Sequence, residues 1–177
     1  MSTVSKIDGL ASGPQGSEQV FEQRKRFVRM VAFNTTSSVR SLAVGDVMAL
    51  STGTSIADGS GFDLDAAFGV GNIVDLADGN SSPLLNAVVG VLSTAVDIPA
   101  NGHAFIDVQV SGKAQAKVAG STDAAAVVGD LFVPSNVAGQ SRKEAGHAEV
   151  AFAIALTTSA ASDGALCDVM LLNPLNY

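Results

Sequence analysis

The feature that most constrains this chain is a regular rhythm of short apolar runs between residues 40 and 172. Runs of roughly five to eight apolar residues alternate with Gly, Asn, Asp, Ser or Pro about every ten residues. Evenly spaced short strands separated by turn residues are typical of β-sandwiches and β-barrels. We therefore predict an all-β fold, either a β-sandwich or a β-barrel. The expected strands lie near 27–33, 46–51, 67–75, 87–94, 103–110, 113–118, 130–134, 148–157 and 165–172.

The intervals between these strands carry two further expectations. Residues 51–66 are rich in Gly and Asp, which indicates a long surface loop or a hairpin tip. A short helix near 83–88, after Ser82-Pro83, remains an alternative to a purely irregular connection.

Three phrases of the sequence occur twice in the same order. Gly45-Asp46 in AVGDVMAL recurs as Gly129-Asp130 in VVGDLFVPS, and each Gly-Asp pair is expected to form a turn that starts a strand. Each is followed by an apolar strand ending in Ser or Thr, an Asn-Gly or Asp-Gly turn, and a strand containing Asp-Val. The Gly-Asp pairs are 84 residues apart and the Asp-Val pairs 61, so the second unit is about 23 residues shorter. We predict two similar modules, at about 40–118 and 119–177, within one β domain at 40–177.

Charge separates the start of the chain from the rest. The first 40 residues carry six cationic and three acidic side chains, a net charge of +3, whereas the remainder carries four and fourteen, a net charge of −10. We predict that residues 1–39 form an extended basic N-terminal arm and the first strand, with residues 1–17 ordered only by a partner. Such an arm suits an acidic protein surface better than nucleic acid, because the body would repel phosphate.

Several classes of protein are disfavoured. The N-terminus lacks an apolar run of signal-peptide length, and no run approaches the length of a membrane span, so we expect synthesis in the cytoplasm and no membrane partner. The single cysteine, Cys167, cannot form an internal disulfide and is expected to be a small buried side chain.

Residues with catalytic or ligand chemistry form no convincing set. Asp58, Asp63 and Asp65 lack the terminal Glu of a calcium loop, and His103 and His147 lack partners at ligand spacing. The GVGNIV run at 69–74 precedes neither a helix of the required length nor a P-loop lysine, and no G-x-S-x-G motif is present. We predict no catalytic residue, no metal and no cofactor. A metal-dependent enzyme using the three Asp residues and His103 is kept as the alternative of another class.

The order of the phrases resembles a known group of proteins. VGDVMAL is followed by VVGVLSTAVDIPANGHAFIDVQVSGKAQAKVAGSTDAAAVVGDLFVPSNVAGQSRK, and then by AFAIALTTSAASDGALCDVMLLN. This succession, over about residues 40–175, resembles the capsid decoration (cement) proteins of tailed bacteriophages. The resemblance implies a β domain on the outer surface of an icosahedral head, bridging subunits of the major capsid protein, often as a trimer.

We therefore predict a non-enzymatic cement protein that binds the major capsid protein lattice and stabilises the mature head. It would be a virion component and a homo-oligomer, a trimer in preference to a dimer. A head fibre, a tail part or another minor virion component is the alternative. Because Arg and aromatic side chains often dominate interface energies, the expected capsid contacts are Phe21, Arg24, Lys25, Arg26, Phe27 and Arg29.

Overall fold

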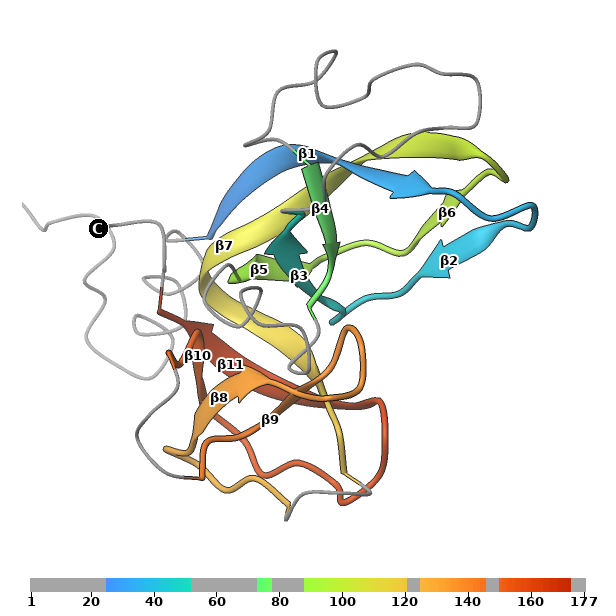
Figure 1. Ribbon diagram of the computed structural model, residues 1–177. Helices are drawn as coiled ribbons and strands as arrows, with labels where there is room; N and C mark the ends of the chain where they lie inside the picture. Colours follow the sequence, from blue (N-terminus) through green and yellow to red (C-terminus); the bar gives the residue numbers. More distant parts are fainter. Residues whose placement is uncertain (1–24, 52–72, 78–87, 121–124, 146–149, 173–177) are drawn as a thin grey trace, which may run out of the picture.

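The computed structural model describes residues 25–51, 73–77, 88–120, 125–145 and 150–172. These residues form strands and turns and contain no helix, so the all-β prediction is confirmed (Figure 1). No helix long and apolar enough to cross a membrane occurs in this part of the chain. The strands are β1 (Arg26–Asn34), β2 (Arg40–Leu42), β3 (Val47–Leu50), β4 (Ile73–Leu76), β5 (Val88–Leu92), β6 (Val96–Ile98), β7 (Gly102–Val118), β8 (Leu131–Pro134), β9 (Ser141–Lys143), β10 (Ala153–Ala155) and β11 (Ala165–Leu171).

Nine of these strands form one sheet that closes on itself twice. The order is β1-β4-β3-β5-β7-β11-β10-β8-β9, with the additional pairings β1–β7 and β7–β9. The first ring, β1-β4-β3-β5-β7, is a closed five-stranded barrel in the upper part of Figure 1. The second ring, β7-β11-β10-β8-β9, lies below it and closes through a single parallel pair, Val118 with Ser141. Strands β2 and β6 form a separate two-stranded ribbon beside the barrel.

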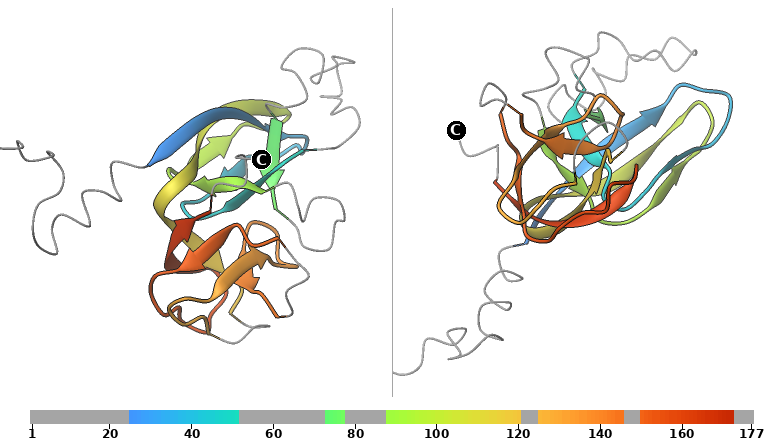
Figure 2. Two further views of the ribbon diagram at one scale, coloured as in Figure 1. Left: turned by 90° about the vertical axis from the view of Figure 1, so that its left-hand side faces the viewer. Right: turned by 90° about the horizontal axis from the view of Figure 1, so that it is seen from below.

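Strand β7 belongs to both rings because it bends in the middle. Its N-terminal half, Gly102–Val110, pairs with β1 and β5, and its C-terminal half, Gly112–Val118, pairs with β11. Gly112 lies at the junction with a φ of 84°, a conformation that costs glycine little. Figure 2 shows the strand passing from one ring to the other. The sequence predicted two strands, at 103–110 and 113–118, and this prediction is wrong in one respect, since they are one bent strand.

The buried side chain of Gln109 supports the bend. Its Nε2 donates hydrogen bonds to Ser111 O at 3.0 Å and to Lys113 O at 2.8 Å, on either side of Gly112. These two hydrogen bonds tie the backbone on either side of Gly112 to one buried side chain, which favours the bent conformation.

Alternating side chains of β7 serve two hydrophobic cores. Ile106, Val108 and Val110 contribute to the core of the barrel, together with Met30, Met48 and Leu92. Beyond the bend, Ala114, Ala116 and Val118 contribute to a second core with Phe132 and Phe152. The period of two along a strand thus continues through the bend. Residues Val47, Ala49 and Val91 of the barrel also belong to the second core, so the two rings share buried surface.

The two Gly-Asp turns found in the sequence have the same local structure. We name Ala43–Asp46 the first turn and Val127–Asp130 the second turn. Both glycines have positive φ, 86° and 94°, and both Asp side chains accept a hydrogen bond from the first residue of the turn, at 2.7 and 2.8 Å. Each turn also exchanges two backbone hydrogen bonds with a neighbouring residue, Leu92 in the first case and Ala155 in the second.

The two rings also agree in strand order and direction. In each ring, the strand after the Gly-Asp turn (β3 or β8) pairs antiparallel with two neighbours, β4 and β5 or β9 and β10. In each ring, one strand (β4 or β9) runs parallel to the ring's first strand, which is β1 or the C-terminal half of β7. The division into modules at 40–118 and 119–177 stays a prediction.

The other expected strands correspond to strands of the structure, but of the strand expected at 148–157 the described residues form strand only at Ala153–Ala155. Three short strands were not foreseen. β2, β6 and β9 have three residues each, too few to show alternation in the sequence. The expected loop at 51–66, most of the expected helix and residues 1–17 lie outside the described residues.

Candidate functional site

The basic cluster lies at the start of β1. Lys25, Arg26, Phe27 and Arg29 are described, whereas Phe21 and Arg24 lie outside the described residues. Residues 26–29 are all exposed, and half of the Phe27 surface is accessible, in contrast to the buried second half of the strand. A phenyl ring exposed among cations is an unusual surface for a strand that only closes a barrel, and it is a candidate contact surface.

Arg29 is held within the chain. Its guanidinium binds Asp107 of β7, directly opposite in the register, through Nε–Oδ1 at 3.0 Å and Nη2–Oδ2 at 3.1 Å. The hydrogen bond from Arg29 lowers the pKa of the Asp107 carboxyl, and the same bond raises the pKa of the guanidinium. Arg29 is therefore paired across β1 and β7 and presents less uncompensated charge than the sequence implied.

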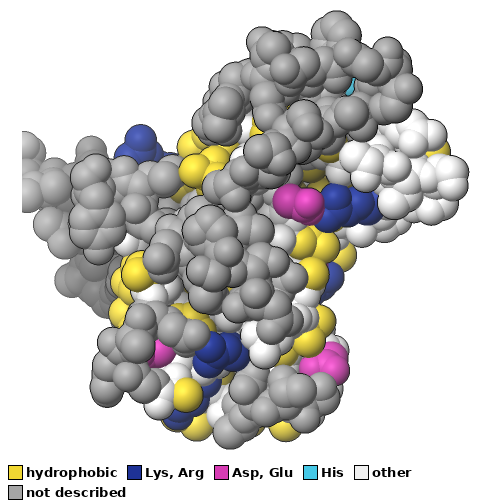
Figure 3. All heavy atoms as spheres, viewed as in Figure 1, with side chains coloured by type: hydrophobic (Ala, Val, Ile, Leu, Met, Phe, Trp, Pro, Cys, Tyr) yellow, Lys and Arg dark blue, Asp and Glu magenta, His cyan; other side chains and the backbone are white. Residues whose placement is uncertain are grey.

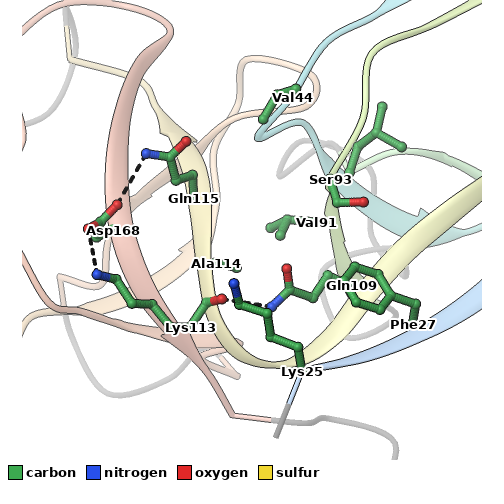
Figure 4. A pocket seen from close by; sticks show the side chains of 11 residues that line it. Lys25, Phe27, Val44, Val91, Ser93, Gln109, Lys113, Ala114, Gln115 and Asp168 are labelled. Carbon is green, nitrogen blue, oxygen red and sulfur yellow. Dashed lines mark hydrogen bonds and ion pairs between the residues drawn. The ribbon is translucent and has the colours of Figure 1, made fainter. Parts of the chain in front are cut away.

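A pocket of about 470 Å³ opens beside this cluster, at the bend of β7 (Figure 4). One wall is formed by Lys25 and Phe27 at the start of β1, and Figure 4 shows the Phe27 ring next to Gln109. The remaining lining residues come from the first turn, β5 and its end, β7 and β11: Val44, Val91, Leu92, Ser93, Gln109, Lys113, Ala114, Gln115 and Asp168.

The opposite wall of the pocket contains a polar network. Lys113 Nζ lies 3.1 Å from Asp168 Oδ2, and Gln115 Nε2 donates to Asp168 Oδ1 at 3.2 Å. Figure 4 shows both side chains directed toward this carboxylate. The pocket thus combines two ammonium groups, one partly neutralised carboxylate and apolar surface. This mixture suits an extended protein segment with apolar and acidic side chains.

Sequence reasoning placed Lys25 and Phe27 in the site but missed Lys113, Gln115 and Asp168. These three residues are far from the basic cluster in the chain, and the bend of β7 brings them to it. No local pattern marks them, since each is an ordinary polar residue of an alternating strand.

The residues considered for catalysis do not converge in the described part of the chain. Asp58, Asp63, Asp65 and His147 lie outside it. His103 is exposed, and its ring lies 5.8 Å from that of Phe33. No group of three or more His, Cys, Asp or Glu side chains placed to hold a metal occurs among the described residues.

Cys167 is buried, as expected, and lies on β11. Its Sγ donates to Thr157 O at 3.2 Å, and burial raises the pKa of the thiol. A buried thiol with a raised pKa is a poor nucleophile, so the structure gives it a packing role.

On the face shown in Figure 3, acidic and basic side chains are interspersed with hydrophobic ones over both rings. No large field of one sign covers the described part of this face. Local contacts such as those of the pocket are therefore better candidates for recognition than a general charge pattern.

The fold is similar to that of a known phage protein. The chain matches the crystal structure of the N base of the head fibre protein gp8.5 of bacteriophage phi29, with a TM-score of 0.50 and 15% sequence identity. The match covers 84% of this chain and 96% of that one. At this identity the likeness shows a shared fold. No protein-family model and no curated protein matches the sequence.

Proposed function

We propose that this chain is a structural component of a phage head, with its β-barrel body serving as an attachment base. The observation that carries the proposal is the fold likeness, which extends over almost the whole N base of the phi29 head fibre protein. The resemblance of residues 40–175 to phage capsid decoration proteins supports the same class of particle independently. The proposed location is the outer surface of the capsid, after synthesis in the host cytoplasm.

The proposed partner is the major capsid protein, bound at the pocket and the start of β1. Lys25 and Phe27 offer a cation and a half-exposed ring at the pocket wall, and Arg26 adds an exposed cation beside them. Arg29 has a lesser proposed role as a contact, since its guanidinium is already bound to Asp107 of β7. Phe21 and Arg24 remain proposed contacts outside the described residues.

A cement function is the second candidate, and the sequence resemblance favours it. A protein that binds only the mature lattice stabilises that lattice by mass action, and many copies make weak contacts effective together. No catalytic step enters either function. A head fibre base and a cement protein differ in what lies beyond the base and in how many lattice positions are filled.

Cryo-electron microscopy of the phage head, with mass spectrometry for the copy number, tests the proposal. Density for the two rings on the outer shell is the expected result. Occupancy of every equivalent lattice position would favour the cement function, whereas a projecting stalk above each base would favour the fibre function. Density on the tail alone, or absence of the chain from the particle, would refute the proposal.

The contact surface has its own test. Replacing Lys25, Arg26 and Phe27 together by Ala should weaken binding to heads lacking the chain and reduce its salt dependence, because cations at an interface rim steer association. The matched control replaces Arg142 and Lys143 of β9 by Ala, which removes two cations from the second ring. Equal binding by both variants would exclude the proposed surface.

A further inference from the structure

One edge of β1 is only partly covered by neighbouring strands. β1 pairs with β7 along its whole length, from Arg26 to Asn34. On the opposite edge, the described residues pair with it only through β4, at Val31 and Ala32. No described strand therefore lies beside residues 26–30 on that side (Figure 1). We name this stretch the open edge, because unpaired N–H and C=O groups at the edge of a sheet can accept a further strand.

The contacts of β7 show which way the backbone of Arg29 faces. Ser93, directly after β5, donates from its Oγ to Asp107 O at 3.3 Å, so the Asp107 carbonyl is directed toward β5. β5 and β1 lie on opposite edges of β7. Arg29 is opposite Asp107 in the register, and two residues in an antiparallel pair either bond to each other or both face away. The N–H and C=O of Arg29 are therefore directed away from β7, to the open edge.

Phe27 has the same backbone orientation. Leu92 of β5 exchanges both of its backbone hydrogen bonds with the first turn, which precedes β3 on the edge of β5 opposite β7. Its neighbour Val91 is directed the other way, toward Gln109, and Gln109 is opposite Phe27. The N–H and C=O groups of Phe27 and Arg29 thus lie together along the open edge.

The two sides of the open edge differ in chemistry. Because successive residues of a strand alternate, Phe27 and Arg29 lie on one side and Arg26 and Val28 on the other. All four are exposed. Arg29 is already bound to Asp107, so the half-exposed ring of Phe27 dominates the first side, whereas Arg26 gives the second side a positive charge. An added strand with apolar residues on one side and acidic residues on the other matches both.

Charge also decides between a foreign strand and a second copy of this chain. Two β1 strands paired at their open edges would bring the Arg26 and Lys25 cations of both copies together, and charges at an edge oppose such self-pairing. The same cations attract a strand that carries carboxylates. An acidic partner strand therefore fits the open edge better than a second copy does.

We propose that the open edge binds an extended segment of alternating acidic and apolar residues, which adds to the barrel as a further strand. Its backbone pairs with the N–H and C=O groups of Phe27 and Arg29. Its apolar residues pack on the Phe27 ring, which is also a wall of the pocket, and its acidic residues lie on the side of Arg26. The inference rests on the proposed capsid partner, because it names the chemistry of the capsid segment bound at this site.

Amide hydrogen exchange of the full chain, followed by NMR, tests the open edge. In the dilute free chain we expect rapid exchange at Phe27 and Arg29, and slow exchange at Val28 and Met30, whose amides face β7. A short synthetic peptide of alternating Val and Glu should slow exchange at Phe27 and Arg29 at least about tenfold. The matched peptide of alternating Val and Lys should not.

Three results of this measurement would overturn the inference. The first is slow exchange at Phe27 and Arg29 in the dilute free chain, since the edge would then already be covered. The second is an equal effect, or no effect, of the two peptides. The third is protection that rises with the concentration of the chain alone, which would assign the edge to a second copy.

Binding to heads lacking the chain connects the open edge with the capsid. Arg29→Pro removes the outward N–H, whereas Arg29→Ala removes the same guanidinium and keeps that N–H. An edge strand tolerates proline where the N–H faces away from its neighbour. We expect Arg29→Pro to bind heads at least about tenfold more weakly than Arg29→Ala, because only the first loses a backbone hydrogen bond and the space for the added strand.

Circular dichroism and thermal unfolding establish that both variants are folded, and Phe27→Pro with Phe27→Ala is the second pair if proline at 29 prevents folding. Equal binding by the proline and alanine variants would overturn strand addition. A wild-type chain that does not bind heads, while the peptide of Val and Glu still protects the edge, would instead refute the capsid partner and leave the acidic strand as the ligand.

Discussion

The ion pair between Asp46 and Lys117 should hold the two rings together, and its twin in the second ring provides an internal control. Asp46 Oδ1 lies 2.5 Å from Lys117 Nζ, with side chains that are 8% and 23% exposed. In the second turn, Asp130 Oδ1 lies 2.9 Å from Lys143 Nζ, with side chains that are 14% and 44% exposed. Both Asp residues also accept a backbone hydrogen bond within their own turn. The two pairs therefore differ mainly in the exposed fraction of the lysine side chain, which is smaller for Lys117 than for Lys143.

We expect Lys117→Met to lower the free energy of unfolding by about 3 kcal/mol, because it leaves a buried carboxylate without its counter-charge. In a chain of this size, that loss corresponds to a fall in Tm of roughly 6–12 °C. Lys143→Met should cost less than about 1 kcal/mol, since water can solvate the carboxylate that remains. Both substitutions keep the aliphatic part of the side chain, so differences in packing are small.

Urea denaturation at neutral pH measures both losses, and a double-mutant cycle isolates the pair. Asp46→Asn combined with Lys117→Met removes both charges, and we expect it to recover about 2 kcal/mol relative to Lys117→Met alone. Equal losses for Lys117→Met and Lys143→Met would refute the reasoning that burial makes the first pair important. A double variant no more stable than Lys117→Met would show that the isolated charge is not the cause.

The remaining predictions concern the turns and the bend. Gly45→Ala and Gly129→Ala should each cost about 1–2 kcal/mol for their positive φ, with a further loss at Gly45 alone, where a Cβ would clash with the opposite ring; thermal unfolding compares them. Gln109→Ala should cost about 2 kcal/mol in urea denaturation by removing its two hydrogen bonds to the backbone on either side of the bend, and an equally stable variant would contradict the supporting role. Backbone and Lys143 hydrogen bonds lower the pKa of Asp130 in the folded state, so its contribution is present above the unfolded pKa and lost as pH falls through the folded pKa. Plots of the free energy of unfolding against pH should therefore be flatter in the acid range for Asp130→Asn than for the wild type.

The local structure of this protein could be read from its sequence to a large degree. The rhythm of apolar runs predicted most strands, and the repeated Gly-Asp phrases predicted two turns that share the same hydrogen bonds. These features depend on neighbours in the chain, since alternation and turn chemistry act over a few residues. The basic cluster was visible in the sequence in the same way, whereas the 50% exposure of Phe27 is known only from the structure.

The long-range arrangement had no such signal. Residues 103–118 form one bent strand and not a hairpin, which depends on Gly112 and on the buried amide of Gln109. Neither residue is distinctive in the sequence, because each has this role only once the strands on both sides are in place. The polar wall of the pocket likewise exists only because the bend brings Lys113 and Asp168 opposite β1.

The sequence by itself determined that the chain is all β and that a Gly-Asp turn would be made twice, because strand alternation and positive φ are local requirements. Only the tertiary structure decided that the rings share β7, and that the first turn is covered while the second is open. Those outcomes depend on which surfaces meet across the chain, and burial, unlike turn geometry, is a property of the assembled fold.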